Sequence, residues 1–331
     1  MINGHGDDLH RYPGRNLINF SSNILSGVDH TPLMEHLARL ASLPASYPDP
    51  DASALARMLG AEDTVVVTAG AVEAIYLIAL AYRGCRSAIV GPTFSEYEDA
   101  CRLHAHTVSH VVSLSDTTGA EMVWLCNPNN PTGRVTPHAT LLAHIKAHPS
   151  TLFVVDQAYA PYTTHPLLTP SEAVAAGNVV MLSSLTKRFS VPGLRIGYAV
   201  GAPGIMARIK AVRMPWSVNA LAIEGACWLL ERADRYPVDA DSLHAEALRL
   251  ASAMGEMGIE TLPTDCNFIL CRLTDGRPAA RLKEWLVEHH NILIRDASNF
   301  YGLTPSHFRI ASQTPAHNDR LINALKQWTT L

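Results

Sequence analysis

The chain has 331 residues, of which 47% are hydrophobic and 17% are charged, and its formal net charge is -4. This length and composition are typical of a globular enzyme with a sizeable core in one or two domains. The slightly acidic balance argues against a protein that binds nucleic acid through its bulk charge.

Targeting and metal signals are weak in this sequence. No apolar run reaches the roughly 18 residues that a membrane span needs, and Met1 to His10 lack the apolar core of a signal peptide. The six cysteines show no metal-like spacing, and most lie in apolar stretches. The histidine pairs, at positions 104 and 106 and at 289 and 290, have no third ligand at a useful spacing. We therefore expect a cytoplasmic protein with no metal and no membrane partner.

Short apolar runs alternate with helical patterns over residues 46–235. The expected strands are Val65–Val67, Ser87–Val90, Thr107–Val112, Val123–Cys126, Leu152–Val155, Val179–Leu182 and Arg195–Val200. Helical patterns lie between them, for example at Ala71–Tyr82, Phe94–Leu103 and Pro137–Ala147. This alternation predicts an α/β fold with a mostly parallel central sheet and helices on both of its faces.

After about Val238 the pattern changes. The expected elements there are helices at Asp241–Met257, Ala279–His289 and Asn318–Thr329, and strands at Asn267–Leu273, Ile292–Arg295 and Phe308–Ala311. Helices and strands in this mixed order predict a smaller α+β domain.

Two residues at the ends of strands indicate the chemistry. Lys187 follows the run Val179–Leu182, with Ser184 three positions before it and Arg195 eight after it. A lysine there can bond covalently to an aldehyde cofactor, and a phosphate on that cofactor would need a hydroxyl and a fixed arginine. Asp156 ends another strand, where an acid can keep a pyridine nitrogen protonated. The alternatives are a surface lysine after a core strand and a helix N-cap at Asp156.

Two turns lie upstream of these residues. The segment from Asn127 to Gly133 is rich in Asn and Pro, which is typical of a stiff turn. The segment from Thr68 to Glu73 follows a short strand and begins a helical run, so its free amides can face an anion.

The order of these motifs resembles the fold-type I enzymes that use pyridoxal 5'-phosphate (PLP), in the class I/II aminotransferase branch. Asn-Pro-Thr-Gly, Asp-x-Ala-Tyr, Ser-x-x-Lys and a following Arg carry the resemblance, which spans residues 3–328. Within that branch, the residues of these motifs most resemble those of two subfamilies, histidinol-phosphate aminotransferase and threonine-phosphate decarboxylase. The resemblance implies a large PLP-binding domain at 46–235 and a small substrate-closing domain built from 1–45 and 236–331.

The resemblance also assigns cofactor roles by position. Lys187 would carry the cofactor and shuttle a proton, Asp156 would hold the pyridine nitrogen, and Asn130 and Tyr159 would bond the phenolic oxygen. The phosphate would be held by Gly70, Ala71, Val72, Ser184 and Arg195. Phe94 would stack on the pyridine ring, with Tyr97 as the competitor for that position.

The same comparison implies residues at the substrate and subunit boundaries. Arg309 would bind a carboxylate or a phosphate of the substrate. Arg295 resembles the extra arginine of the two subfamilies that bind phosphorylated substrates. Asn23 would line the substrate pocket. A salt bridge from Arg295 to Asp296 or another acid is the structural alternative. His5 would reach the substrate phosphate, and Tyr47 would reach the cofactor of a neighbouring subunit in a homodimer.

The sequence therefore predicts a PLP-dependent aminotransferase that acts on a phosphorylated amine or amino acid. A PLP-dependent decarboxylase of threonine phosphate is the alternative enzyme, because the two reactions differ only in which Cα bond lies perpendicular to the ring. A PLP-binding regulator is the non-enzyme alternative, and the intact set of Lys187, Asp156 and Arg309 argues against it.

Overall fold

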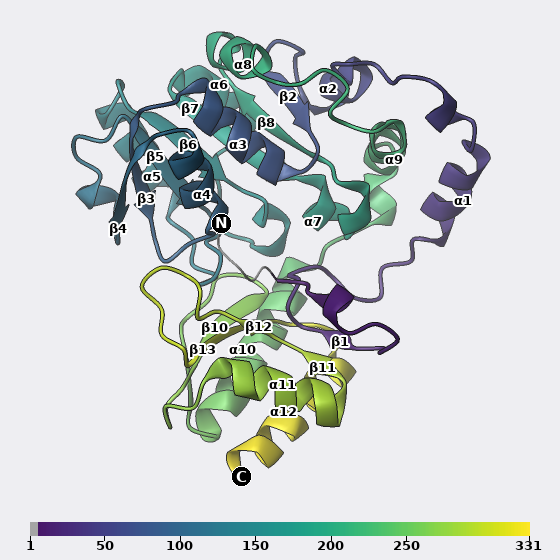
Figure 1. The fold of residues 1–331 in the computed structure, drawn as a ribbon, viewed down its shortest axis with the longest axis vertical. Helices are drawn as coiled ribbons and strands as arrows, with labels where there is room; N and C mark the ends of the chain where they lie inside the picture. The colour runs from purple at the N-terminus through teal and green to yellow at the C-terminus, as the bar shows by residue number, and fades with distance from the viewer. Residues whose placement is uncertain (1–5) are drawn as a thin grey trace.

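A seven-stranded sheet in the order β2-β8-β7-β6-β5-β3-β4 forms the centre of the larger, upper part of the molecule (Figure 1). The computed structural model describes residues 6–331. The strands are β2 Val65–Thr68, β3 Arg86–Val90, β4 Thr107–Val111, β5 Met122–Cys126, β6 Leu152–Asp156, β7 Val179–Ser184 and β8 Gly197–Gly201. Strands β3 to β7 pair in parallel, whereas β8 is antiparallel to β2 and β7. The mostly parallel sheet expected from the sequence is confirmed.

Both faces of this sheet are buried, which explains why its strands are almost continuously apolar. In β2, Val65 and Val67 face one core cluster and Val66 faces the other. The second cluster is covered by α3 Ala71–Ala81, α4 Glu96–Leu103 and α8 Pro203–Lys210. The first is covered by α1 Thr31–Arg39, α2 Ser53–Leu59, α5 His138–Ala147, α6 Pro170–Ala176 and α9 Ala220–Leu230.

Strand β8 begins two residues later than expected. Arg195 has a φ of 56° and ends a 3-10 turn, so the extended backbone starts only at Gly197. Because β8 runs antiparallel to β7, its beginning lies at the edge where the parallel strands end. Arg195 is therefore placed at the same edge as the residues that follow β6 and β7.

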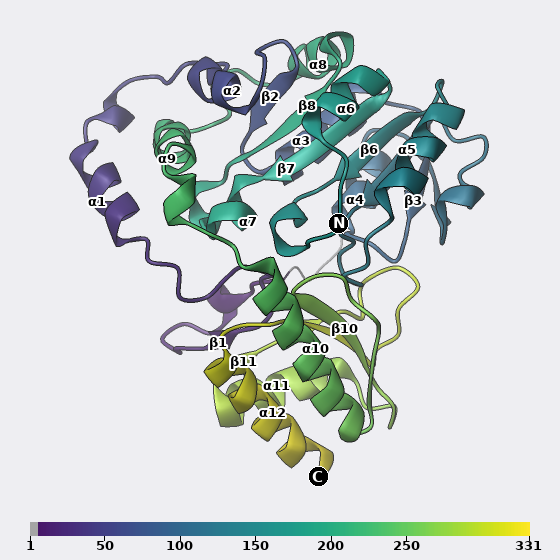
Figure 2. The same ribbon diagram turned by 180° about the vertical axis from the view of Figure 1, so that it is seen from behind.

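A four-stranded antiparallel sheet in the order β12-β13-β10-β9 forms the lower part of the molecule (Figures 1 and 2). Its strands are β9 Ile259–Thr261, β10 Phe268–Leu273, β12 Arg295–Asp296 and β13 His307–Ala311, and its helices are α10 Ala240–Glu256, α11 Ala279–His290 and α12 Pro315–Thr329. Side chains alternate along β13, so Phe308 and Ile310 pack on the helices while Arg309 points to the other face.

The expected strand Ile292–Arg295 is split in the structure. Ile292–Leu293 forms β11, which pairs in parallel with β1 (Ile18–Asn19), whereas β12 pairs with β13. The N-terminal segment thus joins the smaller part, although α1 packs on α9 of the larger part. The domain boundaries at residues 46 and 235 stay a prediction.

Among residues 6–331, no helix combines the length and the apolar character that crossing a membrane requires. In the same part of the chain, no group of three His, Cys, Asp or Glu side chains is arranged to hold a metal ion, and the six cysteines are free thiols.

Candidate functional site

A cavity of about 450 Å³ lies between the ends of the large-sheet strands and the open face of the small sheet. It brings together most of the residues that the sequence predicts for the site. The predicted residues that line it are Gly70, Ala71, Val72, Phe94, Asn130, Asp156, Tyr159, Ser184, Lys187, Arg195, Arg295 and Arg309. These residues are contributed by eight separate segments. Six of them meet because the strands of the large sheet end at one edge, and the other two, with Arg295 and Arg309, come from the small sheet.

One end of the cavity is suited to an anion. Helix α3 begins there without a side-chain cap, so its first N–H groups and the positive end of its dipole face the cavity. Gly70 has a φ of 88°, and an added Cβ would lie 2.6 Å from Arg195 Nη2. Only glycine allows this approach of the guanidinium to the start of the helix. With Ser184 at the end of β7, this end of the cavity fits the phosphate of the predicted cofactor.

Lys187 lies in the short helix α7 (Leu185–Phe189), just after β7. Its Nζ donates a hydrogen bond of 2.7 Å to the carbonyl oxygen of Ser22, and Nζ lies 5.7 Å from the centre of the Tyr159 ring. Burial, assisted by the nearby Arg309 charge, lowers the pKa of Lys187 to about 7, while Asp7 and Asp156 act in the opposite direction. A large share of the amine is therefore neutral and nucleophilic near neutral pH.

Asp156 is buried at the end of β6 and held by two donors. Its Oδ2 accepts a 2.7 Å hydrogen bond from the Tyr97 hydroxyl, and its Oδ1 accepts one of 2.9 Å from the Ala158 backbone. Burial raises the pKa of Asp156, and these two bonds partly offset the rise. The carboxylate is thus oriented and ready to pair with a protonated ring nitrogen.

The structure gives Phe94 and Tyr97 different surroundings. Tyr97 is fully buried, stacks on Trp124 with the ring centres 5.5 Å apart, and donates to Asp156. Phe94 meets Tyr97 edge to face at 5.8 Å and lines the cavity as a partly exposed ring. This arrangement favours Phe94 for stacking on the cofactor and gives Tyr97 the role of supporting Asp156.

Replacement of Tyr97 with phenylalanine is expected to weaken cofactor binding about 10-fold. The change removes a hydrogen bond to a charged acceptor, which is worth about 1.5–3 kcal/mol, and the pKa of Asp156 then rises further. Absorbance titration of the apoprotein with PLP measures the affinity. Tyr82→Phe is the matched control, because Tyr82 packs under Arg208 away from the cavity. Equal affinities for Tyr97→Phe and the wild type would contradict this role.

Arg309 connects the substrate end of the cavity to the cofactor end. Its side chain is 3% exposed; Nη1 donates to Asn130 Oδ1, and Nη2 donates to the Ser21 carbonyl oxygen. The Asn130 oxygen is therefore occupied, which leaves the amide N–H groups of Asn130 available for a phenolic oxygen. Burial raises the pKa of Tyr159, so its hydroxyl stays protonated as a second donor.

Arg295 and Arg309 face each other across the β12–β13 pair. Arg295 is 8% exposed, and it donates to the Asp296 carbonyl oxygen at 2.7 Å and to Asn299 Oδ1 at 2.8 Å. Burial and then Arg309 lower the pKa of Arg295 to about 10. Like charges directly opposite in a sheet destabilise it, so this pair indicates a place where an anion binds.

Of the predicted residues that the structure describes, Asn23 and Tyr47 do not line the cavity. Asn23 is fully buried beside Tyr159. Tyr47 is 84% exposed and packs on Trp216 with ring centres 5.1 Å apart. His5 lies outside the described residues. The roles of all three stay predictions.

The sequence did not identify several other residues of the cavity wall, among them Glu96, Cys126, Thr186 and Phe300. Glu96 accepts a 2.8 Å hydrogen bond from the Tyr76 hydroxyl. Glu96 and Cys126 lie next to predicted motifs in the sequence, and this position was the one sequence feature that could have identified them as cavity residues. Phe300 comes from a loop whose position depends on the tertiary fold.

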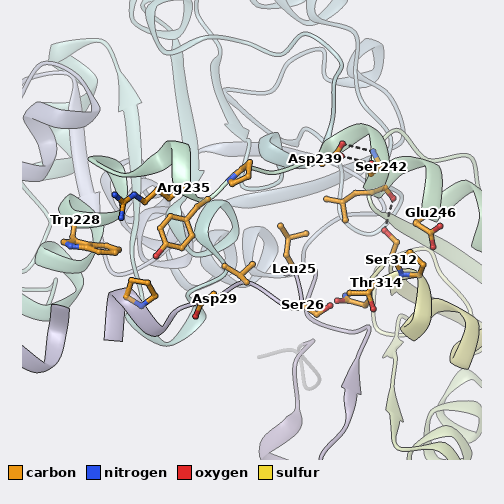
Figure 3. Close-up of a pocket in the computed structure, with 18 residues that line it drawn as sticks. Leu25, Ser26, Asp29, Trp228, Arg235, Asp239, Ser242, Glu246, Ser312 and Thr314 are labelled. Atoms are coloured by element: carbon orange, nitrogen blue, oxygen red, sulfur yellow. Dashed lines mark hydrogen bonds between the residues drawn. The ribbon is translucent and has the colours of Figure 1, made fainter. Parts of the chain in front are cut away.

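A second cavity, of about 550 Å³, lies between the segment Leu25–Asp29, the connection into α10 and the turn before α12 (Figure 3). Its polar groups include Asp239, which accepts a 2.7 Å hydrogen bond from Ser242. Within residues 6–331, no predicted site residue lines this cavity, so it is not the place of the predicted chemistry.

Comparison with known proteins identifies the family of the chain. The profile of the family Aminotransferase class I and II matches residues 15–325. The chain is 30% identical over 308 residues to histidinol-phosphate aminotransferase from Symbiobacterium thermophilum, covering 89% of this chain and 79% of that protein. The crystal structure of L-threonine-O-3-phosphate decarboxylase from Porphyromonas gingivalis is 37% identical with a TM-score of 0.92, covering 95% of this chain and 100% of that chain.

A histidinol-phosphate aminotransferase from Sinorhizobium meliloti, solved in complex with pyridoxal-5'-phosphate, has the same fold. Its TM-score is 0.84 at 20% identity, and the match covers 98% of this chain and 94% of that chain. The family profile spans nearly the whole chain, and the fold is that of the fold-type I enzymes. The chain therefore belongs to the aminotransferase class I and II family of PLP-dependent enzymes.

Proposed function

We propose that this enzyme is a PLP-dependent aminotransferase that acts on a phosphorylated amine or amino acid, in the manner of a histidinol-phosphate aminotransferase. The observation that carries the proposal is the buried pair Arg295 and Arg309, in register on adjacent strands and in the same cavity as Lys187. Two fixed guanidinium groups beside a lysine of lowered pKa are suited to an anionic substrate that carries an amine.

The residues present fit PLP along the whole cavity. The start of α3 at Gly70, with Ser184 and Arg195, would hold the phosphate. Asp156 would pair with the pyridine nitrogen, and the phenolic oxygen would accept from Asn130 and Tyr159. Phe94 would cover one face of the ring. When bound, the cofactor supplies the electron sink that stabilises negative charge at the substrate Cα.

Lys187 would have two tasks in the reaction. It would anchor the cofactor. With the substrate bound, its free amine would take the proton from Cα of the substrate and return it to C4' of the cofactor. A pKa of about 7 suits both tasks, because the amine can accept and donate a proton near neutral pH. The carbonyl oxygen of Ser22, 2.7 Å from Nζ, would hold the amine in place between these steps.

With a phosphorylated amino acid, Arg309 would bind the carboxylate on Cα and Arg295 would bind the phosphate at the far end, whereas with a phosphorylated amine both would face the single phosphate. Arg309 contacts Asn130, which lies at the cofactor end, whereas Arg295 is held by Asn299 in the loop after β12. The two sites would thus fix both ends of the substrate and set the orientation of its Cα bonds. Asn23 would support this wall from behind Tyr159.

Decarboxylation of a phosphorylated amino acid such as threonine phosphate is the second candidate. The 37% identity to the Porphyromonas gingivalis decarboxylase favours it. Both reactions need the same lysine, aspartate and arginines. The choice between them depends on whether the Cα–H or the Cα–carboxylate bond lies perpendicular to the ring.

Incubation of the PLP-loaded enzyme with histidinol phosphate and with threonine phosphate tests the proposal. With 2-oxoglutarate as amino acceptor, a keto product and glutamate without carbon dioxide are expected. Carbon dioxide release from threonine phosphate, with no transfer to the acceptor, would replace the aminotransferase with the decarboxylase. Cofactor binding without turnover of any amine would favour a regulator instead.

The enzyme is further proposed to work as a cytoplasmic homodimer. Six free thiols fit a reducing compartment. Tyr47 and Trp216 form an exposed aromatic pair, with Met214 also exposed nearby in the sequence. Exposed apolar groups of this kind mark interaction surfaces, and a second subunit seated there would bring Tyr47 toward the cofactor phosphate of its neighbour.

Mixing Tyr47→Phe and Lys187→Ala proteins, each of low activity, is expected to restore part of the activity. A hybrid dimer places both changes in one site and leaves the other site intact. Activity is assayed after subunit exchange, and each variant mixed with itself is the control. A fully active monomer in analytical ultracentrifugation would rule out the shared site.

A further inference from the structure

The loop that follows β12 reaches from the small sheet to the edge of the large sheet at β4 (Figures 1 and 2). Tyr301, in this loop, stacks on His110 of β4 with ring centres 3.7 Å apart and planes within 8°. Tyr301 is 61% exposed, so it does not pack into a core. The stack therefore joins two parts of the molecule that close on the cavity from opposite sides.

The His110 side of the stack is mostly buried and lies beside a carboxylate. His110 Nε2 lies 3.0 Å from Glu98 Oε2, and Glu98 Oε1 accepts a 2.6 Å hydrogen bond from Arg102 Nε. The imidazole is only 13% exposed, and β4 is an edge strand paired along its length with β3. His110 thus presents a mostly buried ring to the loop.

The loop side of the stack leads to the substrate arginine. Two residues before Tyr301, Asn299 Oδ1 accepts a 2.8 Å hydrogen bond from Arg295 Nη2. Phe300 lies under the same guanidinium at 5.3 Å and lines the cavity. Three consecutive residues therefore connect the stack to the substrate site: Asn299 bonds Arg295, Phe300 lines the cavity and Tyr301 forms the stack.

A small cavity of about 130 Å³ lies behind the stack. It is lined by Thr93, Phe94, Ser95 and Asn299 together with the two stacked rings. This cavity separates the loop from the large sheet, so the stack rather than continuous packing joins the two at this point. Loss of the stack is expected to let the loop move into or away from that space.

We propose that Tyr301 and His110 form an interdomain clasp that positions Arg295 for the substrate phosphate through Asn299. Tyr301, His110 and Asn299 are positioning residues, since none of them needs to touch the reacting atoms. The phosphate part rests on the proposed function, whereas the clasp itself rests on the geometry of the stack alone.

The first test measures the loop without any substrate. Hydrogen exchange of residues 297–303 is compared in the PLP-loaded wild type, His110→Ala and Tyr301→Ala. Both variants are expected to exchange faster there, while His104→Ala, which removes an imidazole outside the clasp, should behave as the wild type. Exchange in His110→Ala equal to the wild type would overturn the clasp, whichever substrate the enzyme uses.

The second test connects the clasp to Arg295. In Tyr301→Ala, KM for the phosphorylated substrate is expected to rise about 3- to 10-fold with kcat changed less than about twofold, in line with the roughly 0.5–1.5 kcal/mol that an aromatic pair contributes. Tyr301→Phe keeps the stack and should keep the wild-type KM. The double variant with His110→Ala should be no worse than either single change.

Three results distinguish the possible failures. Additive KM effects of the two changes would show that Tyr301 and His110 act separately, which overturns the clasp. Faster loop exchange with an unchanged KM would overturn the link to Arg295. A wild type that shows no preference for phosphorylated substrates would overturn the proposed function and the positioning role together, while the exchange measurement would still decide on the clasp.

Discussion

Lys187→Ala is expected to lower kcat by about 10⁴-fold or more, because the change removes the general base that moves the Cα proton and also the anchor of the cofactor. Lys187→Arg should not restore turnover, since a guanidinium stays charged at neutral pH and cannot act as a nucleophile. The assay follows formation of the keto product with excess PLP present.

The control for this experiment is Lys146→Ala, an exposed lysine of α5. Its activity is expected to match the wild type. If Lys187→Ala kept more than about a tenth of the wild-type kcat, the role of Lys187 would be refuted, because general acid–base catalysis alone is worth about 10²–10⁴-fold.

Arg295→Ala is expected to lower kcat/KM for phosphorylated substrates by about 30- to 1000-fold. A lost charge-assisted contact of this kind costs on the order of 2–4 kcal/mol. Lysine at this position should rescue only part of the loss, because an ammonium group lacks the planar fork. PLP affinity should stay unchanged, since Arg295 lies on the small sheet away from the phosphate end at Gly70.

Arg272→Ala is the matched control for Arg295→Ala. Arg272 lies on β10 of the same sheet but forms an exposed ion pair with Glu260, which contributes little. Steady-state kinetics with phosphorylated and unphosphorylated amino acids distinguish a site that binds a substrate phosphate from one that binds only a carboxylate. If the wild type prefers an unphosphorylated amino acid and Arg295→Ala leaves that activity intact, the phosphate proposal is wrong and Arg309 alone clamps a carboxylate.

The large sheet could be predicted because its signal is local. Strands such as Leu152–Asp156 and Val179–Ser184 are short, apolar and buried on both faces, so a continuous run identifies each of them without knowledge of its partners. Asp156 and Lys187 come directly after these strands, and parallel strands bring their ends together. The order of the motifs was therefore enough to predict most of the residues at the cofactor end of the cavity.

The substrate end depends on pairings between segments far apart in the sequence. The split of Ile292–Arg295 into β11 and β12 arises because residues 292–293 pair with β1 and residue 295 pairs with Arg309. The register that places Arg295 opposite Arg309, and the stack of Tyr301 on His110, follow from these contacts. No local pattern encodes them. The bond from Tyr97 to Asp156 also joins separate segments, 59 positions apart.

Reduction of the purified PLP-loaded enzyme with borohydride, followed by peptide mapping, tests the central claim most directly. The bond between the cofactor and its lysine becomes permanent on reduction, so the labelled residue can be read by mass spectrometry. We expect a single labelled peptide with the cofactor on Lys187. A label on any other lysine, or no covalent label on fully loaded protein, would contradict the account.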